Sequence, residues 1–209
     1  AFYEYDWDDI SKVPELMVEK FRDPHYIHFI AKYILNINLL PFQCVILQTF
    51  WEKPFPILIA TRGGGKSFLL AVYIVLRMMM HQGCKIAVVG AALRQSMVIF
   101  NYVKTIYDNS PILQDICRTH PKRDQHMCHW TCGSSYAVFL PLGTGEKIRG
   151  QRANIIVCDE FASVDPEIFE TVVRGFAAVK SDGLHENVVA KYKKQITKHL
   201  TSSENNNFQ

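Results

Sequence analysis

The chain has 209 residues, of which 48% are hydrophobic and 21% are charged, and its formal net charge is +3. These values suit one α/β domain with a sizeable core, argue against wholesale disorder, and give too little charge to indicate nucleic acid as a partner by themselves. No apolar run reaches the ~20 residues of a membrane span and no signal peptide stands out, so we expect an intracellular protein without membrane contact. The six cysteines are scattered, which favours free thiols in a reducing compartment.

The first part of the chain is predicted to be mainly helical. Residues 1–24 are aromatic and acidic and are expected to form an arm or a short lead-in helix. Residues 25–36 have the pattern of an amphipathic helix, and residues 42–51 that of a second helix. Pro54 and Pro56 then favour an extended backbone.

The rest of the chain alternates between predicted strands and helices. Short apolar runs predict buried strands at 56–60, 85–90 and 155–158, and an alternating run predicts one at 135–140. Helices are expected at 68–80, at 93–107 and after Pro166, residues 117–133 are expected to form a polar loop, and residues 186–200 a basic helix or tether. This alternation predicts a mostly parallel, three-layer α/β fold with helices on both faces of the sheet.

A glycine cluster joins the predicted strand 56–60 to the predicted helix 68–80. Backbone N–H groups at a helix N-terminus, the helix dipole and a lysine together bind phosphate. Gly65-Lys66-Ser67 matches the end of the motif G-x-x-x-x-G-K-[ST], although Ala60 replaces its first glycine. An ordinary glycine turn is the alternative, which the strand and helix on either side disfavour. We therefore predict a nucleotide-phosphate site formed by Thr61, Arg62, Gly63, Gly64, Gly65, Lys66 and Ser67.

An acidic pair follows the predicted strand 155–158. A carboxylate at the carboxyl edge of a parallel sheet can hold Mg²⁺ beside a phosphate loop. We predict that Asp159, together with Ser67, binds Mg²⁺ and that Glu160 orients or deprotonates the attacking water. A polar cap that ends a core strand would explain the same residues if the phosphate loop were not present. The second carboxylate favours hydrolysis, because a protein that only binds nucleotide does not need a base.

Three further side chains are candidates for the nucleotide site. Arg62, within the glycine cluster, and Arg149 can spread positive charge over the phosphate that is transferred. Gly150 follows Arg149 and suggests a protruding turn that reaches a neighbouring subunit, whereas a surface salt bridge is the simpler explanation for either arginine. Gln43 could bind adenine through its amide, or it could equally serve as an ordinary residue at a helix N-terminus.

The segment 117–132 also contains cysteines and histidines that could suggest zinc, but their spacing is not that of a familiar finger, so we favour a solvated loop. The lysine-rich run 191–198 is more typical of a solvated helix face than of a nucleic-acid contact.

Four segments in this order resemble a known family: Pro41-Phe42-Gln43, the variant phosphate loop 61–67, Ile148-Arg149-Gly150-Gln151-Arg152, and Val157-Cys158-Asp159-Glu160. The set resembles the ATPase domain of the large terminase subunit of tailed bacteriophages, the motor that packages DNA. The resemblance covers about residues 38–175. It implies an additional-strand, RecA-like P-loop ATPase with ATP and Mg²⁺, and it places Arg149 at the position of a trans-acting arginine finger.

The same resemblance implies partners and a domain organisation. It predicts double-stranded DNA as the polymer, the portal protein and the small terminase subunit as partners, a homo-oligomeric ring, and a location in the host cytoplasm at the procapsid portal vertex. We expect an N-terminal arm and lead-in helices over residues 1–37, a P-loop ATPase core over 38–185, and a basic helix or tether with a polar tail over 186–209. We find no convincing coupling motif and no aspartate cluster of the family's nuclease, so only the ATPase part is expected.

Two other functions fit the residues themselves. One is a RecA-like helicase or translocase on nucleic acid. The other is a nucleotide-gated assembly module that binds ATP and turns it over poorly. Replacing Glu160 by Gln separates the second from a motor, because only a motor should lose turnover.

Overall fold

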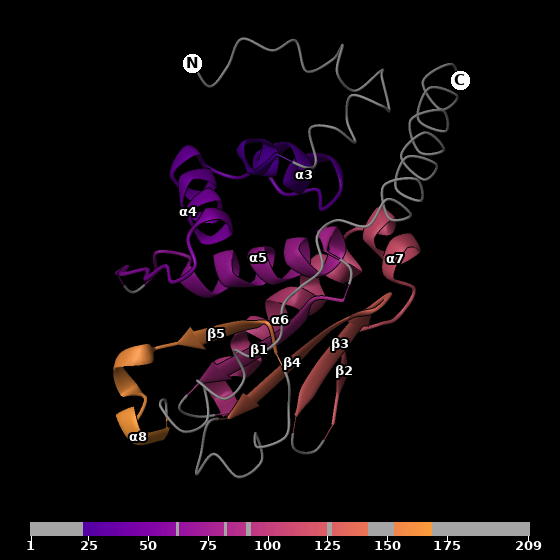
Figure 1. Ribbon diagram of the computed structural model, residues 1–209. Helices are drawn as coiled ribbons and strands as arrows, with labels where there is room; N and C mark the ends of the chain where they lie inside the picture. Colours follow the sequence, from indigo (N-terminus) through magenta and orange to yellow (C-terminus); the bar gives the residue numbers. More distant parts are fainter. Residues whose placement is uncertain are drawn as a thin grey trace, which may run out of the picture.

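The computed structural model describes residues 23–61, 63–81, 83–90, 93–124, 127–141 and 153–168, and a five-stranded sheet organises this part of the chain (Figure 1). The strand order is β2-β3-β4-β1-β5. The strands are β1 (Lys85–Gly90), β2 (Lys122–Arg123), β3 (Cys128–Cys132), β4 (Ser135–Pro141) and β5 (Ile155–Asp159). The adjacent strands β4, β1 and β5 are parallel, whereas β2 and β3 continue from β4 as an antiparallel meander.

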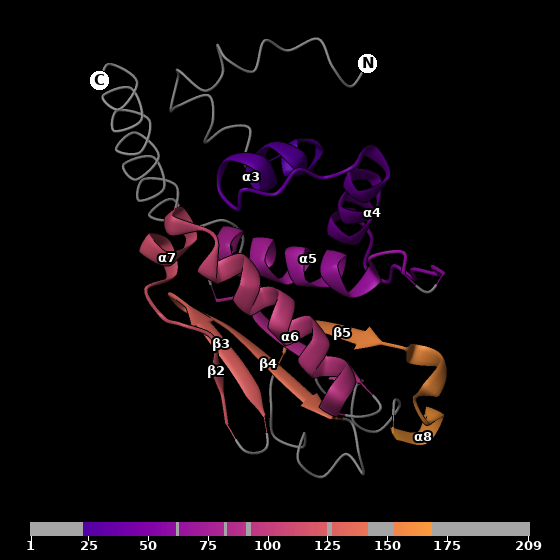
Figure 2. The ribbon, with the colours of Figure 1, turned by 180° about the vertical axis from the view of Figure 1, so that it is seen from behind.

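Two long helices cover one face of this sheet (Figure 2). They are α5 (Lys66–Met80) and α6 (Leu93–Asp108). The apolar segment of α5 is buried on nearly all sides, as expected of a helix without a polar face. The main core joins these helices to inward side chains of the sheet, including Val88, Phe139 and Trp130. The mixed α/β class with a mostly parallel sheet is therefore confirmed, and it is compatible with a RecA-like P-loop fold.

The opposite face of the sheet has a smaller apolar cluster. Ala87, Val89, Val138 and Leu140 form its centre together with Ala153. Among the described residues, the helices that contact the sheet all join the main core on the first face.

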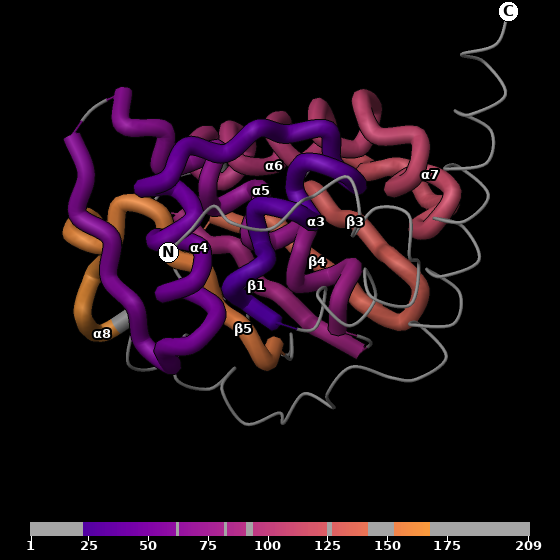
Figure 3. Tube along the Cα trace, turned by 90° about the horizontal axis from the view of Figure 1, so that it is seen from above, coloured from indigo at the N-terminus to yellow at the C-terminus, as the bar shows by residue number. Residues whose placement is uncertain are grey.

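The N-terminal helices lie over α5, on the side away from the sheet, and α4 packs against it (Figures 1 and 3). They are a 3-10 turn η1 (Pro24–Tyr26), α3 (Ile27–Tyr33) and α4 (Pro41–Glu52). The guanidinium of Arg77 on α5 lies 4.1 Å from the centre of the Trp51 ring and donates to the Trp51 carbonyl oxygen at 2.9 Å. This cation–π contact and hydrogen bond tie the end of α4 to α5. No helix in the described ranges is long and apolar enough to cross a membrane.

The predicted strand at 56–60 is wrong. These residues form no strand but loop out from the body of the molecule between α4 and α5 (Figure 1). Ile57 and Ile59 are 83% and 93% exposed, whereas Leu58 between them is partly buried and packs against the main core. A strand needs the backbone of a neighbouring strand for its hydrogen bonds, and an apolar composition alone does not supply that neighbour.

The prediction of a polar loop at 117–133 is also wrong. A short helix α7 (Pro111–Cys117) leads into β2 and β3, and Cys128, Trp130 and Cys132 alternate into the core. Within the described part, no group of three histidine, cysteine or acidic side chains could hold a metal. The other predicted elements are confirmed with small shifts of their ends, and the last of them continues as a 3-10 turn η2 (Phe161–Ser163) and the start of α8 (Pro166–Ile168). Residues 1–22, the rest of the last predicted helix and the basic tether lie outside the described residues.

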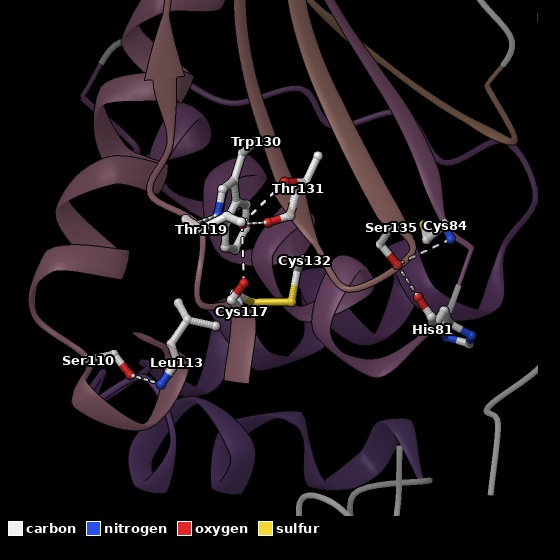
Figure 4. Close-up of a disulfide and its surroundings, with 10 residues drawn as sticks. All are labelled: His81, Cys84, Ser110, Leu113, Cys117, Thr119, Trp130, Thr131, Cys132 and Ser135. Atoms are coloured by element: carbon white, nitrogen blue, oxygen red, sulfur yellow. Dashed lines mark hydrogen bonds between the residues drawn. A yellow bond between two sulfur atoms is a disulfide. The ribbon is translucent and has the colours of Figure 1, made fainter. Parts of the chain in front are cut away.

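A disulfide joins the end of α7 to the end of β3 (Figure 4). It links Cys117 to Cys132, so the expectation of free thiols is wrong for these two cysteines. The other four cysteines are free, as expected. Around the bridge, the Trp130 indole N–H donates to the Thr119 carbonyl oxygen at 2.9 Å, and the Thr119 hydroxyl donates to the Thr131 carbonyl oxygen.

Removing this disulfide is expected to lower the free energy of unfolding by about 3 kcal/mol, because a bridge across about 15 residues restricts the unfolded chain by that amount. The test is urea unfolding of the wild type with and without reductant. The double variant Cys117→Ser/Cys132→Ser is the control, since reductant should leave its unfolding unchanged. Equal unfolding midpoints for oxidised and reduced wild type would contradict the prediction.

Candidate functional site

The glycine turn before α5 has the geometry of an anion cradle. Gly63 and Gly65 have φ angles of 86° and 73°, a region that side chains disfavour. A Cβ on Gly64 would lie 3.1 Å from the Thr61 carbonyl oxygen, which also accepts from the Gly64 N–H. No side chain caps α5, so the N–H groups of its first turn remain available to a ligand, and Ser67 lies in this turn.

Lys66 connects this turn to the end of the sheet. Its Nζ lies 3.2 Å from Oδ1 of Asp159, the last residue of β5. The Asp159 side chain is 6% exposed and the Lys66 side chain 31%, so the carboxylate is buried while the lysine is partly open to a ligand. A carboxylate as buried as this needs a positive partner, and the lysine supplies it.

Glu160 follows Asp159 in the chain, and both its backbone and its side chain form hydrogen bonds. It is exposed and lies in the left-handed region, at φ 51° and ψ 48°. Its N–H donates to Asp159 Oδ1 at 3.0 Å, and its Oε2 accepts from Gln95 Nε2 at 2.8 Å. The two acidic side chains thus differ in environment: Asp159 is buried against a cation, and Glu160 faces water. This division suits one carboxylate for binding and one for proton transfer.

Gln43 lies at the side of the glycine turn. Its Oε1 accepts from the Leu40 N–H at 2.9 Å, which fixes the N-terminus of α4. Its Nε2 lies 3.9 Å from the position that a Cβ on Gly65 would take. Gln43 therefore caps α4, and its amide lies near the glycine turn.

Cys158, which precedes Asp159 in β5, is not a reactive group. Burial raises the pKa of its thiol to about 11, so it remains protonated at neutral pH. The chemistry of the site therefore rests on Lys66 and the two carboxylates.

The residues present fit a nucleotide phosphate with magnesium. A side chain at Gly64 would crowd the Thr61 carbonyl oxygen, and a buried carboxylate lies beside a lysine. Magnesium needs only one or two carboxylates when phosphate oxygens and water complete its shell, which agrees with Asp159 as the acidic ligand.

The structure brings together residues that lie far apart in the chain. The carboxyl edge of the sheet brings together the acidic pair Asp159 and Glu160, Lys66 at the start of α5, the glycines Gly64 and Gly65, and Gln43. Arg62 and Arg149, the two predicted arginines, lie outside the described residues. Sequence reasoning missed the contact of Gln95 with Glu160, although Gln95 follows a predicted strand and the ends of parallel strands meet at one edge.

A comparison with known protein families matches residues 57–181 to the family described as RNA cytidine acetyltransferase NAT10/TcmA, helicase domain. The matched segment is well over half of the chain. It includes the glycine turn, Lys66 and both carboxylates, and the description is that of an enzyme. A comparison with curated proteins finds no match.

The family match corrects the resemblance drawn from motifs. The interpretation as a terminase of tailed bacteriophages is wrong, and so are DNA packaging as the function and double-stranded DNA, portal protein and small terminase subunit as partners. The physical reason is that a Gly-Lys-Ser turn and an Asp-Glu strand end serve to hold phosphate and metal. They do not specify which polymer is moved, so related ATPases share them. The description of the matching family names a helicase domain. A RecA-like helicase or translocase on nucleic acid was the first of the two alternative functions considered from the sequence.

Proposed function

We propose, because the chain belongs to the family described as RNA cytidine acetyltransferase NAT10/TcmA, helicase domain, that it binds and hydrolyses ATP in order to act on RNA. The observation that carries this proposal is the contact between Lys66 Nζ and Asp159 Oδ1 at 3.2 Å. It joins the N-terminus of α5 to the carboxyl end of β5, which is where an α/β sheet of this type binds its ligand.

The glycine turn and α5 bind the phosphates in this proposal. Backbone N–H groups of residues 63–67 donate to phosphate oxygens, aided by the dipole of α5. Lys66 moves its ammonium group from Asp159 onto a phosphate oxygen, where it balances negative charge. Asp159 and the Ser67 hydroxyl are then the groups that would hold Mg²⁺, which supplies charge neutralisation at the phosphates.

Glu160 is the base for hydrolysis in this proposal. Its carboxylate accepts a proton from water as the water oxygen bonds to the terminal phosphorus. The bond from that phosphorus to the bridging oxygen breaks, and ADP and phosphate leave. Arg62 is assigned to the phosphates and Arg149 to the transferred phosphoryl group, where either would stabilise spreading negative charge. The Gln43 amide is assigned to the adenine.

RNA is proposed as the polymer because the matching family is described as an RNA enzyme. An ATPase that moves along RNA should contact mainly phosphates and sugars, because such contacts do not depend on base sequence. RNA should therefore raise the rate of ATP hydrolysis more than duplex DNA does.

The test is steady-state ATP hydrolysis by the 209-residue chain with single-stranded RNA, with duplex DNA, and without nucleic acid. We expect hydrolysis that RNA stimulates, and an ATP affinity at least about 10-fold lower for Lys66→Met, because a charged contact to phosphate is lost. Lys104→Met is the matched control, since Lys104 forms an exposed pair with Asp108 on α6. Absence of hydrolysis under all three conditions would overturn the proposal, and stimulation by duplex DNA alone would overturn its RNA part.

A further inference from the structure

Glu160 is connected to a second element besides the strand that precedes it. Its Oε2 accepts a hydrogen bond of 2.8 Å from Nε2 of Gln95, which lies in the first turn of α6. The two residues are 65 positions apart. They meet because β1 and β5 are parallel neighbours, with Gly90 opposite Asp159, so the chain segments that follow both strands emerge at the same edge.

The backbone at Glu160 is fixed, but packing does not fix its side chain. The left-handed conformation and the bond from its N–H to Asp159 Oδ1 determine where the side chain starts. The carbonyl oxygen of Glu160 accepts from the Ser163 N–H at 2.8 Å and so begins η2. The side chain itself is exposed, so without a polar partner its carboxylate would sample several rotamers. The hydrogen bond from Gln95 selects one orientation.

The chemistry of this contact suits a base. An amide N–H donates to a carboxylate without adding charge and does not compete for the proton at any ordinary pH. With Oε2 held by Gln95, the remaining oxygen of Glu160 can accept a proton from water. Because α6 follows β1 directly in sequence, the donor lies on an element that packs on the sheet and is not on a free loop.

We propose that Gln95 is a positioning residue, which holds the Glu160 carboxylate in the orientation that proton transfer requires. This inference rests on the proposed function, in which Glu160 is the base. A displacement of about 1 Å at a reacting group can lower a rate by about 100-fold. The loss of the Gln95 hydrogen bond should therefore lower kcat. ATP binding depends on the glycine turn and Lys66, so KM should change little.

The experiment measures kcat and KM for ATP hydrolysis in Gln95→Met, which keeps the side-chain length but removes the donor, and in Gln95→Glu, which places a second carboxylate there. We expect kcat to fall by about 10-fold to 100-fold in the first and further in the second, with KM within about 2-fold. In a Glu160→Gln background, Gln95→Met should have no further effect on the rate, because the oriented base is already lost. Gln48→Met, on α4, is the matched control and should keep the wild-type kcat.

The outcomes separate the two proposals. If the wild type hydrolyses ATP and Glu160→Gln does not, an unchanged kcat in Gln95→Met overturns the positioning role and leaves the proposed function intact. If the wild type does not hydrolyse ATP, or Glu160→Gln keeps full turnover, the proposed function fails and this inference fails with it. Thermal unfolding of each variant shows whether a lower rate follows from lost stability. If the variants unfold at the wild-type midpoint and the effects of Gln95→Met and Glu160→Gln on kcat are additive in the double variant, the inference is also overturned.

Discussion

Replacing Glu160 by Gln is expected to lower kcat for ATP hydrolysis by about 100-fold or more and to leave ATP binding nearly unchanged. A positioned base contributes about 10² to 10⁴ to a rate, and an amide cannot accept the proton. The phosphate contacts come from the glycine turn and Lys66, which this change does not touch. Fluorescent-nucleotide titration measures binding, and phosphate release in a single turnover measures the chemical step.

Glu167→Gln is the matched control for this prediction. Glu167 is an exposed glutamate in α8, seven positions after Glu160, so the same change in charge should leave turnover at the wild-type level. Should Glu160→Gln bind ATP and keep most of its turnover, the catalytic role of Glu160 would be refuted. The alternative of a nucleotide-gated assembly module would then gain support.

Replacing Trp130 by Ala is expected to lower the free energy of unfolding by about 3–5 kcal/mol, the largest effect on stability that we predict. Trp130 is fully buried at the centre of β3, where its ring packs edge-on against Tyr107 at a centroid distance of 5.9 Å. Its N–H also donates to the Thr119 carbonyl oxygen, which would lose that donor. Trp130 therefore contributes to the packing of β3 against α6.

Urea unfolding with the disulfide intact measures this effect. Trp130→Phe should cost less, because it keeps most of the apolar contact and loses only the N–H and part of the volume. Phe55→Ala is the surface control: Phe55 is 90% exposed, and its removal should change the free energy of unfolding by no more than about 0.5 kcal/mol. A loss below about 1 kcal/mol for Trp130→Ala would contradict the buried position of the ring.

The sequence indicated part of the candidate site because several of its residues belong to local patterns. Gly65, Lys66 and Ser67 form a turn and helix start whose geometry depends on neighbours in sequence. Asp159 and Glu160 follow an apolar run that ends at an edge of the sheet. The hydrogen bond between Gln95 and Glu160 has no such pattern, since it depends on which strands are neighbours and in what register.

The errors in the fold also have a physical cause. The run 56–60 is as apolar as β5, yet Ile57 and Ile59 are exposed, because composition does not supply the neighbouring strand that would pair with it. In β3, the burial of every second residue was hidden by a cysteine- and histidine-rich composition that suggested a loop. The motif resemblance failed for a related reason, since phosphate and metal ligands do not encode the polymer on which an ATPase acts.

Local patterns were enough to predict the α/β class, the strands β1, β4 and β5, and the helices α4, α5 and α6. They also indicated the glycine turn and the acidic end of β5, because each of these features depends on periodicity or on adjacent residues. The strand order, the Cys117–Cys132 bridge, the contact of Lys66 with Asp159 and the hydrogen bond from Gln95 to Glu160 could be known only from the folded molecule. These contacts join positions far apart in the chain, and they form only where the packing of helices on the sheet brings those positions within a few ångströms of each other.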